Sequence, residues 1–327
     1  MASVVYGSPY VPPAPLPPAW SGLPMSWTAK GVEWSLSDPK SGIILLPGVR
    51  GLGSVAVERH ATVSPAAAGS RYEGTSVLDR EVFWPIHIYS DSSSVDWVLR
   101  DRAFWAGMDP QDTGVWRVTH PDGRHRSLRL RFVSDGDHST SGDPTQRGWD
   151  TYAVTLVAEQ PFWVGEPVVK SFSADPAPEP FFEPNGPQVV NIAPGYSVSN
   201  AVMDNPGDVE SYPRWYVQGP VTSACVGVGG VVVDVPFAVP EWKTLVIESD
   251  PDLLGATMYD VTVHGAAKKP SERVIGVDLV NPVDMTAALG AADFAAIPAG
   301  DAVPLSLTLL GAGKVEALLP TQYRRAW

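Results

Sequence analysis

Apolar and polar residues alternate along much of the first half of the chain, as expected for strands that bury one face. This period-two pattern predicts strands at residues 43–46, 82–89, 115–119, 125–133 and 151–158. The sequence HPDG at 120–123 supplies a proline, a capping aspartate and a glycine, so it predicts a tight turn between two of these strands. One segment, 92–105, has a helical pattern, with serines and Asp96 at its start and Gly107 after its end.

Alternation is clearer in the second half of the chain. Apolar side chains alternate with polar ones at Tyr259, Val261 and Val263, and again at Leu305, Leu307 and Leu309. Further strands are predicted at residues 214–218, 231–235 and 244–248, and residues 284–296 are compatible with a short helix. Short strands separated by Pro or Gly turns favour an antiparallel β-sandwich. The fold class is therefore all-β with one or two short helices.

Two proline-rich stretches divide the chain. The sequence VPPAPLPPA at 11–19 favours an extended polyproline arm, which is either a docking strap or a spacer. Residues 166–187 have the composition of a semi-rigid connector. Since 327 residues exceed one compact core, we expect an arm at 1–20, a first domain at 21–165, a linker at 166–187 and a second domain at 188–327.

Charge and cysteine content exclude several classes of protein. A formal net charge of −13 argues against a general nucleic-acid binder, which needs Lys and Arg to neutralise phosphates. Cys225 is the single cysteine, so it can form neither an intrachain disulfide nor a cysteine-based zinc site, and a buried, inert thiol is expected. No signal peptide and no long apolar run are found, so neither export nor a membrane anchor is expected.

Motifs for catalysis are not found. The sequence has no G-x-S-x-G elbow, no P-loop and no H-E-x-x-H, so no enzyme activity, catalytic residue or cofactor is expected. The glycines at 48–53 fit a loop or bulge better than a dinucleotide site. There are two groups of possible metal ligands, namely His120, Asp122 and His125, and Asp135, Asp137 and His138. Both groups lie in predicted turns, where an Asp side chain commonly caps its own backbone. No metal site is therefore expected.

Two sets of residues are candidates for binding. Arg129 and Arg131 alternate with apolar residues on one predicted strand, so its polar face is cationic. That face either pairs with acidic residues of a neighbouring subunit or is simply solvated. In the second domain, three aromatic side chains either stack on a sugar ring or pack in the core; they are Trp215, Tyr216 and Trp242.

Landmarks in order along nearly the whole chain resemble the distal tail protein of long-tailed phages, often called a minor tail protein in actinobacteriophages. In the first half they are Trp34-Ser35-Leu36, the glycines at 48–53, EVFWPIHIY, the helix that follows, and YAVTLVAEQPFW ending at Trp163. In the second half they are NPGDVESYPRWYVQGP at 205–220, IPAGDAVPLSLTLLG at 297–311 and the final YRRAW. The proline-rich arm is more prominent than that family pattern demands.

This resemblance implies a split-barrel first domain related to tail-tube proteins and a galectin-like second domain. It also implies a homo-oligomer, a hexameric ring in the virion at the distal end of the tail, assembled in the host cytoplasm, with DNA passing through the lumen. The implied partners are the tail tube protein, the tape-measure protein and tip or baseplate proteins. As an alternative, the second domain is a carbohydrate-binding module that contacts a host-surface glycan; a polysaccharide hydrolase is disfavoured because no acid/base pair stands out.

Overall fold

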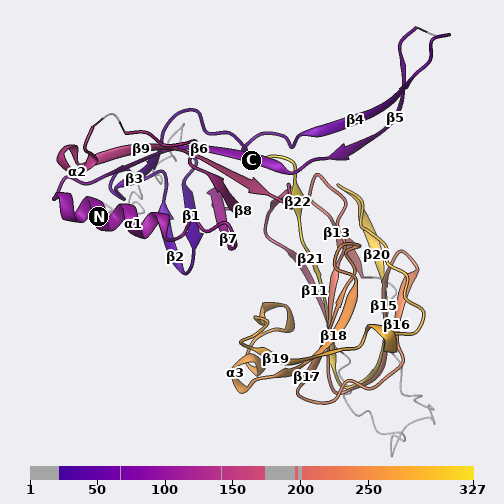
Figure 1. Ribbon diagram of the computed structural model, residues 1–327. Helices are drawn as coiled ribbons and strands as arrows, with labels where there is room; N and C mark the ends of the chain where they lie inside the picture. Colours follow the sequence, from indigo (N-terminus) through magenta and orange to yellow (C-terminus); the bar gives the residue numbers. More distant parts are fainter. Residues whose placement is uncertain (1–21, 67, 141, 174–195, 198–200) are drawn as a thin grey trace, which may run out of the picture.

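The computed structural model describes residues 22–66, 68–140, 142–173, 196–197 and 201–327. Within them the chain is nearly all-β with three short α-helices, and it forms two domains (Figure 1). The predicted fold class is therefore confirmed. The polyproline stretch at 11–19 and part of the proline-rich connector lie outside the described residues.

One antiparallel sheet, curved into a nearly closed barrel, forms the first domain, in the order β2-β1-β7-β8-β9-β6-β3. Its strands are β1 (Met25–Ala29), β2 (Val32–Ser35), β3 (Ile43–Leu45), β6 (Arg80–Tyr89), β7 (Thr113–Thr119), β8 (His125–Ser134), β9 (Trp149–Ala158) and β10 (Trp163–Val164). The strands predicted here from alternation are confirmed. The predicted turn between β7 and β8 also forms, since the Gly123 amide donates to the His120 carbonyl and Gly123 has a φ of 86°.

Four buried tryptophans form the centre of the first domain. Their ring centroids follow one another at 5.2 Å from Trp27 to Trp84, 5.2 Å from Trp84 to Trp116 and 5.0 Å from Trp116 to Trp163, with edge-to-face or tilted planes. All four indole N–H groups lack a hydrogen-bond partner among the described residues. Edge-to-face packing directs the positive ring edge toward the π face of the next ring, which partly compensates for the missing acceptors.

The predicted helix is confirmed as α1 (Ser94–Trp105), which lies along the sheet (Figure 1). The Ser93 side chain caps it by accepting a hydrogen bond from the Asp96 amide. Phe104 is fully buried, and the indole N–H of Trp97 donates to the Ile88 carbonyl at the edge of β6. A second, one-turn helix, α2 (Pro144–Arg147), precedes β9.

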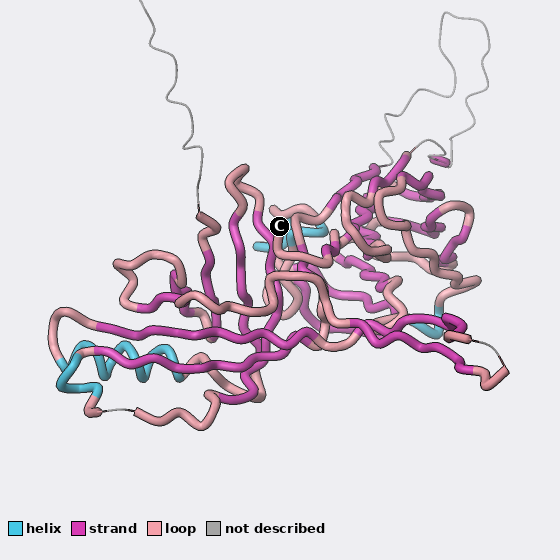
Figure 2. Tube along the Cα trace, turned by 90° about the horizontal axis from the view of Figure 1, so that it is seen from above, coloured by secondary structure: helices cyan, strands magenta, loops and turns pink. Residues whose placement is uncertain are grey.

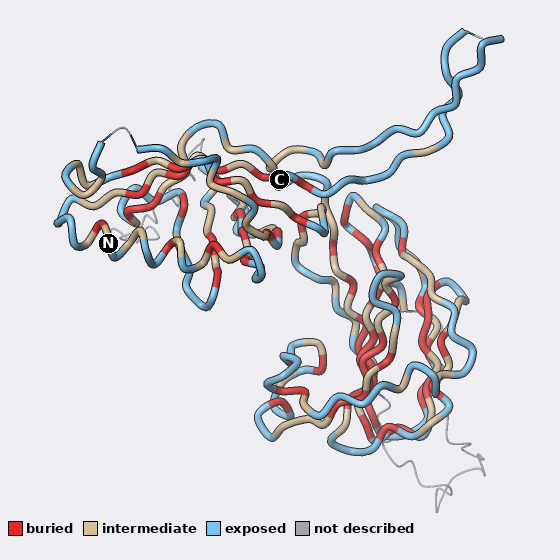
Figure 3. The backbone as a smooth tube through the Cα atoms, viewed as in Figure 1, coloured by how far each residue is buried: buried red, intermediate tan, exposed pale blue. Residues whose placement is uncertain are grey.

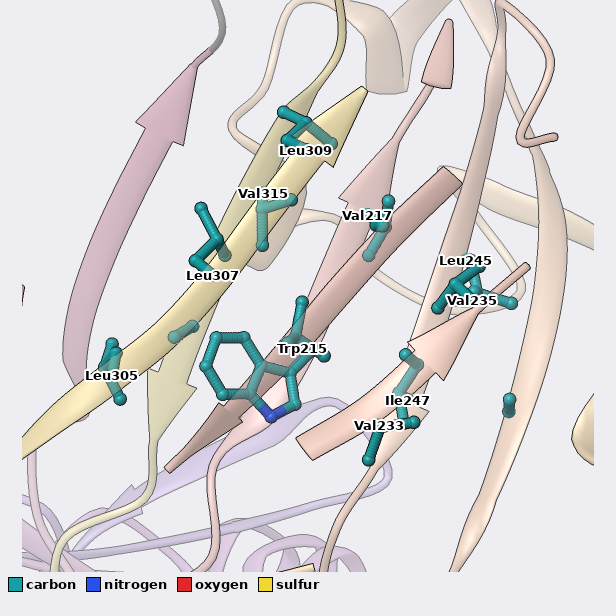
Figure 4. Close-up of a cluster of buried hydrophobic side chains, with 14 of the residues drawn as sticks. Trp215, Val217, Val233, Val235, Leu245, Ile247, Leu305, Leu307, Leu309 and Val315 are labelled. Carbon is teal, nitrogen blue, oxygen red and sulfur yellow. The ribbon is translucent and has the colours of Figure 1, made fainter. Parts of the chain in front are cut away.

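Two facing antiparallel sheets form the second domain, in the orders β11-β21-β14-β17-β18-β19 and β12-β20-β15-β16, with β13 beside β20. Apolar side chains from both sheets meet between them, among them Trp215, Val217 and Leu307 (Figure 4). The strands are β11 (Val168–Ser173), β12 (Tyr196–Ser197), β13 (Val202–Asp204), β14 (Arg214–Gln218), β15 (Val221–Val228), β16 (Val231–Val235), β17 (Lys243–Glu248), β18 (Gly255–Val261), β19 (Leu279–Asp284), β20 (Ala302–Gly311) and β21 (Lys314–Leu319). The predicted sandwich is thus present.

Three details differ from the sequence-based predictions. Residues 168–173, expected in the linker, form β11 and pair with β21, so the second domain's first strand precedes residue 188. The strand predicted from Tyr259 to Val263 ends at Val261, because Thr262 caps the short helix α3 (Val263–Ala266), which Val263 begins. Between 284 and 296 there is only one 3-10 turn, at Thr286–Ala288. A further 3-10 turn lies at Pro270–Glu272.

The end of the chain returns to the first domain. Strand β22 (Gln322–Tyr323) pairs with β10, and the amide of the fully buried Ala326 donates to the Leu52 carbonyl. The guanidinium of Arg126 lies 3.6 Å from the Tyr323 ring centre and donates to the Arg325 carbonyl. The expected second domain of 188–327 therefore ends in a tail that belongs to the barrel.

Arg80 joins this tail to the rest of the barrel. Its side chain is only 3% exposed, and its guanidinium donates to the carbonyl oxygens of Pro161, Gly51 and Gly53 at 2.6, 2.8 and 2.6 Å. A fourth bond, of 2.8 Å, reaches the carbonyl of Arg324 in the C-terminal tail. Burial lowers the pKa of Arg80. We call this arrangement the Arg80 clamp.

Replacing Arg80 with Met is expected to lower the free energy of unfolding of the barrel by about 3 kcal/mol or more, because four carbonyls lose a charged donor inside the protein. Urea unfolding followed by tryptophan fluorescence measures this. Arg71→Met is the control, since that side chain is 86% exposed, and it should change stability by less than about 0.5 kcal/mol. Equal unfolding midpoints for the two variants would show that the clamp is unimportant.

Candidate functional site

A long hairpin projects from the barrel and is the most exposed ordered element described. Its strands, β4 (Val57–Val63) and β5 (Ser70–Val77), form a sheet of their own that pairs with no other strand. Figures 1 and 2 show it extending well beyond the barrel, and Figure 3 shows it exposed along nearly its whole length. Apolar side chains on it face solvent, including Val63 and Tyr72, which is 57% exposed.

Elementary energetics indicate that this hairpin needs a partner. A two-stranded hairpin with no buried face is marginally stable in water. Both outer edges of the hairpin also present unpaired backbone groups, which are ready acceptors and donors for another strand. An exposed, open-edged element with apolar side chains facing solvent is a candidate interface.

The Arg80 clamp sits at the root of the hairpin. The Leu78 amide donates to the Ala56 carbonyl and closes the base, and Arg80 follows two residues later. On the other side, Gly51 and Gly53, whose carbonyls Arg80 binds, lie in the loop that leads to β4, the first strand of the hairpin. Gly51 has a φ of 105°, and a side chain there would collide with Val82, so only glycine fits this close approach. The clamp thus sets the direction in which the hairpin leaves the barrel.

The two arginines of the predicted cationic face of β8 differ in their contacts. Arg131 donates to the Glu159 carboxylate and to the backbone carbonyls of Pro110 and Gln111, so its partners are within the chain. Arg129 is exposed and lies opposite Val115 on β7. A contact with a neighbouring subunit thus remains a prediction, and Arg129 is the better placed of the two arginines.

Of the three aromatics proposed to stack on a sugar, two are buried. Trp215 is 1% exposed in the sandwich core, and Tyr216 is 4% exposed on the opposite face of the same sheet. Neither ring offers a face to a ligand, so of the two alternatives given for these residues, packing in the protein interior applies to both. Trp242 is 61% exposed, and for this residue the prediction stands untested.

Several of the His and Asp side chains of the predicted turns have partners within the chain. The Nε2 atom of His120 lies 2.7 Å from the Ala326 carbonyl, Asp122 pairs with Arg124, and His138 lies 3.1 Å from Asp150. Within the described residues no group of three His, Cys, Asp or Glu side chains is placed to hold a metal ion.

A pocket of about 250 Å³ lies at the junction of the two domains, lined in part by His125, Glu166 and Pro206. Its Arg126 and Tyr323 side chains stack on each other, and its His120 contacts the C-terminal tail. These side chains therefore hold the C-terminal tail on the barrel. Its lining residues include no Ser, Thr or Cys beside a histidine.

Comparison with known proteins identifies the fold. No family model and no curated protein sequence matches the chain. Among solved structures, the Dit protein of phage SPP1 superposes with a TM-score of 0.55 at 12% identity, covering 90% of this chain and 98% of that one. The chain has the Dit fold. A chain of the phage P2 baseplate, in its activated conformation with calcium, superposes with a TM-score of 0.54 at 9% identity, covering 92% and 98%.

The same baseplate in its strontium-bound form gives the same values, a TM-score of 0.54 and 9% identity. The Dit fold thus accounts for both domains, in agreement with the resemblance seen in the sequence. In the described part of this Dit-like chain, no helix is long and apolar enough to cross a membrane.

Sequence analysis missed the hairpin of this Dit-like chain. Its strands, VERHATV and SRYEGTSV, have no buried face, so their apolar residues do not form the regular alternation that predicts a half-buried strand. The glycine-containing turn between them and their Val, Thr and Tyr content were the available signals.

Replacing residues 57–77 with Asn-Gly should leave the Dit-like body folded, because the hairpin has no residue in the barrel core and its base is already closed. The expected change in the free energy of unfolding is less than about 1 kcal/mol. Circular dichroism and thermal unfolding measure it. Loss of cooperative unfolding would mean that the hairpin is part of the folded core after all.

Cys225 is half-buried on β15, and burial, followed by a hydrogen bond to Asp234, raises the pKa of its thiol to about 11. Since only the thiolate reacts, alkylation by iodoacetamide at pH 8 should be about two hundredfold slower than that of free cysteine. The rate should rise about tenfold from pH 8 to pH 9. Mass spectrometry over this pH range tests it; a rate near that of free cysteine would contradict it. Asp234→Asn, which removes the carboxylate, should react faster than the parent chain.

Proposed function

We propose that this chain is a structural protein of the phage tail tip, a hub ring that joins the tail tube to tip or baseplate proteins. The Dit protein of SPP1 is described as a paradigm of the hub adsorption apparatus in phages that infect Gram-positive bacteria. The shared fold extends over 90% of this chain, so both domains support the proposal. The observation that carries it is the exposed β4–β5 hairpin, which has no partner within the described chain.

A ring requires each copy to present two different, complementary surfaces. The hairpin supplies one of them, with two open edges and apolar side chains that gain from being covered. The outer surface of the barrel of the next copy supplies the other, and Arg129 is available there for a carboxylate partner. With the proposed six copies, the contact repeats until the ring closes.

In this proposal the tail tube protein binds one side of the ring, and the tape-measure and baseplate proteins bind the other. DNA passes through the lumen, and a net charge of −13 per chain favours passage over adhesion. The role is architectural and not catalytic. Assembly in the reducing host cytoplasm is consistent with a chain whose single cysteine forms no disulfide.

A carbohydrate-binding role is the second candidate, and it now depends on one aromatic side chain, that of Trp242. Trp242 is exposed beside Gln218 and Glu241, a combination of aromatic platform and polar groups that suits a sugar. Binding of the full chain to a glycan array, abolished by Trp242→Ala, would establish this role.

Negative-stain electron microscopy and native mass measurement test the hub. The purified chain is expected to form rings with a central hole and a mass six times that of the 35.0 kDa chain. The variant in which Asn-Gly replaces residues 57–77 should be monomeric, because it lacks one of the two complementary surfaces. Leu253→Ala, an apolar change at an exposed residue outside the hairpin, is the control and should leave the rings intact.

A chain that stays monomeric at high concentration and in the presence of its tail partners would refute the hub. Rings formed equally well without the hairpin would leave the hub intact but would refute the role of the hairpin.

A further inference from the structure

The exposed Trp242 occupies an unfavourable backbone conformation. Its φ is 66°, in the left-handed region, which costs a bulky L-residue about 1 kcal/mol. Burial of its ring does not offset this, because the side chain is 61% exposed. A bulky residue held in such a conformation at the surface suggests a use for its position.

The Trp242 ring forms one wall of a pocket of about 270 Å³, whose other walls include Pro220, Val261 and Ala266. We call this pocket the Trp242 groove. Next to it, Val263 is 92% exposed and Val277 is also exposed, and the bond from the Thr262 amide to the Asp278 carbonyl holds their two segments side by side. The groove thus has apolar and aromatic walls beside the polar side chains of Gln218 and Glu241, and further apolar side chains are exposed next to it.

Three polar groups in the Trp242 groove are free to bind a ligand. Within the described residues, the indole N–H of Trp242 and the carboxylate of Glu241 have no hydrogen-bond or ion-pair partner. The Gln218 side chain accepts a bond from Arg273 through its oxygen, which fixes its orientation and leaves its amide N–H₂ available. An extended peptide, whose carbonyls are unpaired, offers acceptors for the two N–H donors.

The first 21 residues of the chain have the matching chemistry. They include six prolines and no charged residue, and VPPAPLPPA lies at 11–19. Segments that remain in solution by themselves are usually charged and poor in aromatics, whereas this one has Tyr6, Tyr10 and Trp20. Proline-rich segments bind to aromatic-lined grooves because their extended conformation is already fixed before binding.

We infer that residues 11–19 of one copy dock in the Trp242 groove of a neighbouring copy. Only Trp20 and Ser21 separate this stretch from Gly22, so its C-terminal end can lie at most about 10 Å from Gly22. Gly22 leads into β1, near the edge strand β2 of the first domain, whereas the groove belongs to the second domain (Figure 1). The arm is then a strap between successive copies, in addition to the hairpin.

The strap between copies rests on the proposed hub, but contact between the peptide and the groove does not. The probe is a synthetic, fluorescently labelled peptide of residues 9–20. The receptor is the full-length chain with five arm prolines replaced by Ser, so that its own arm does not compete; they are Pro12, Pro13, Pro15, Pro17 and Pro18. Fluorescence anisotropy should show saturable binding.

Trp242→Ala in this receptor should weaken peptide binding by about tenfold or more, because the ring is the main apolar contact. Leu253→Ala is the matched control, since Leu253 is also exposed but follows the far end of β17, and it should leave affinity unchanged. A peptide with its prolines replaced by alanine should not bind. Equal affinity for the Trp242→Ala chain, or no binding to the parent receptor, would overturn the inference. Binding of a soluble oligosaccharide to the groove, without any binding of the peptide, would also overturn the inference.

Disulfide trapping identifies which copy supplies the arm. In a Cys225→Ser background, a chain with Leu16→Cys is mixed with a chain carrying Ala266→Cys, and oxidation should give a covalent heterodimer. Leu253→Cys in place of Ala266→Cys should give none. If both cysteines in one chain yield only internally bridged monomers, the arm docks within its own copy and the neighbouring-copy inference is refuted.

Discussion

The positions of the hairpin and of the C-terminal tail depend on one buried cation. The guanidinium of Arg80 is nearly inaccessible to solvent, and its hydrogen bonds all go to backbone carbonyls. These carbonyls belong to the loop at Gly51 and Gly53, to Pro161 between β9 and β10, and to Arg324 in the C-terminal tail. A buried charge is tolerated only when its hydrogen bonds are satisfied. Because all the acceptors are main-chain atoms, these three segments must keep their places relative to one another for Arg80 to be buried at all.

This constraint links local geometry to assembly. The loop held by Arg80 leads directly into the hairpin, and the tail held by Arg80 follows the last strand of the sandwich. The same side chain therefore fixes the direction of the hairpin and ties the second domain to the first. A closed ring forms only if the angle between successive copies is constant, since a small error in a repeated contact gives a filament or an open arc.

The sequence was informative wherever one face of an element is buried. Alternation located β6 to β9 because Val82, Trp84 and Ile86 fall at every second position inside the barrel. It failed for the hairpin, which buries neither face. For Trp215 and Tyr216 the sequence left sugar stacking and core packing as alternatives; adjacent residues on a strand face opposite sides of the sheet, and both of these side chains are buried, in two separate apolar clusters. The role of Arg80 depends on a bond to a residue 244 positions away, for which local patterns have no signal.

The proline-rich connector shows a similar limit. Its composition predicts a connector at residues 166–187, yet Val168 to Ser173 form β11, because β21 offers a complete antiparallel partner. Local composition describes the conformation that a segment prefers alone, and pairing with a distant strand overrides that preference.

Hydrogen exchange of the hairpin amides, compared between dilute single chains and the assembled particle, tests the central claim most directly. The two outer edges of β4 and β5 have unpaired amides in the single chain, so these should exchange rapidly there and become protected in the particle. Hairpin amides that exchange equally fast in both states, while the particle remains assembled, would contradict the account.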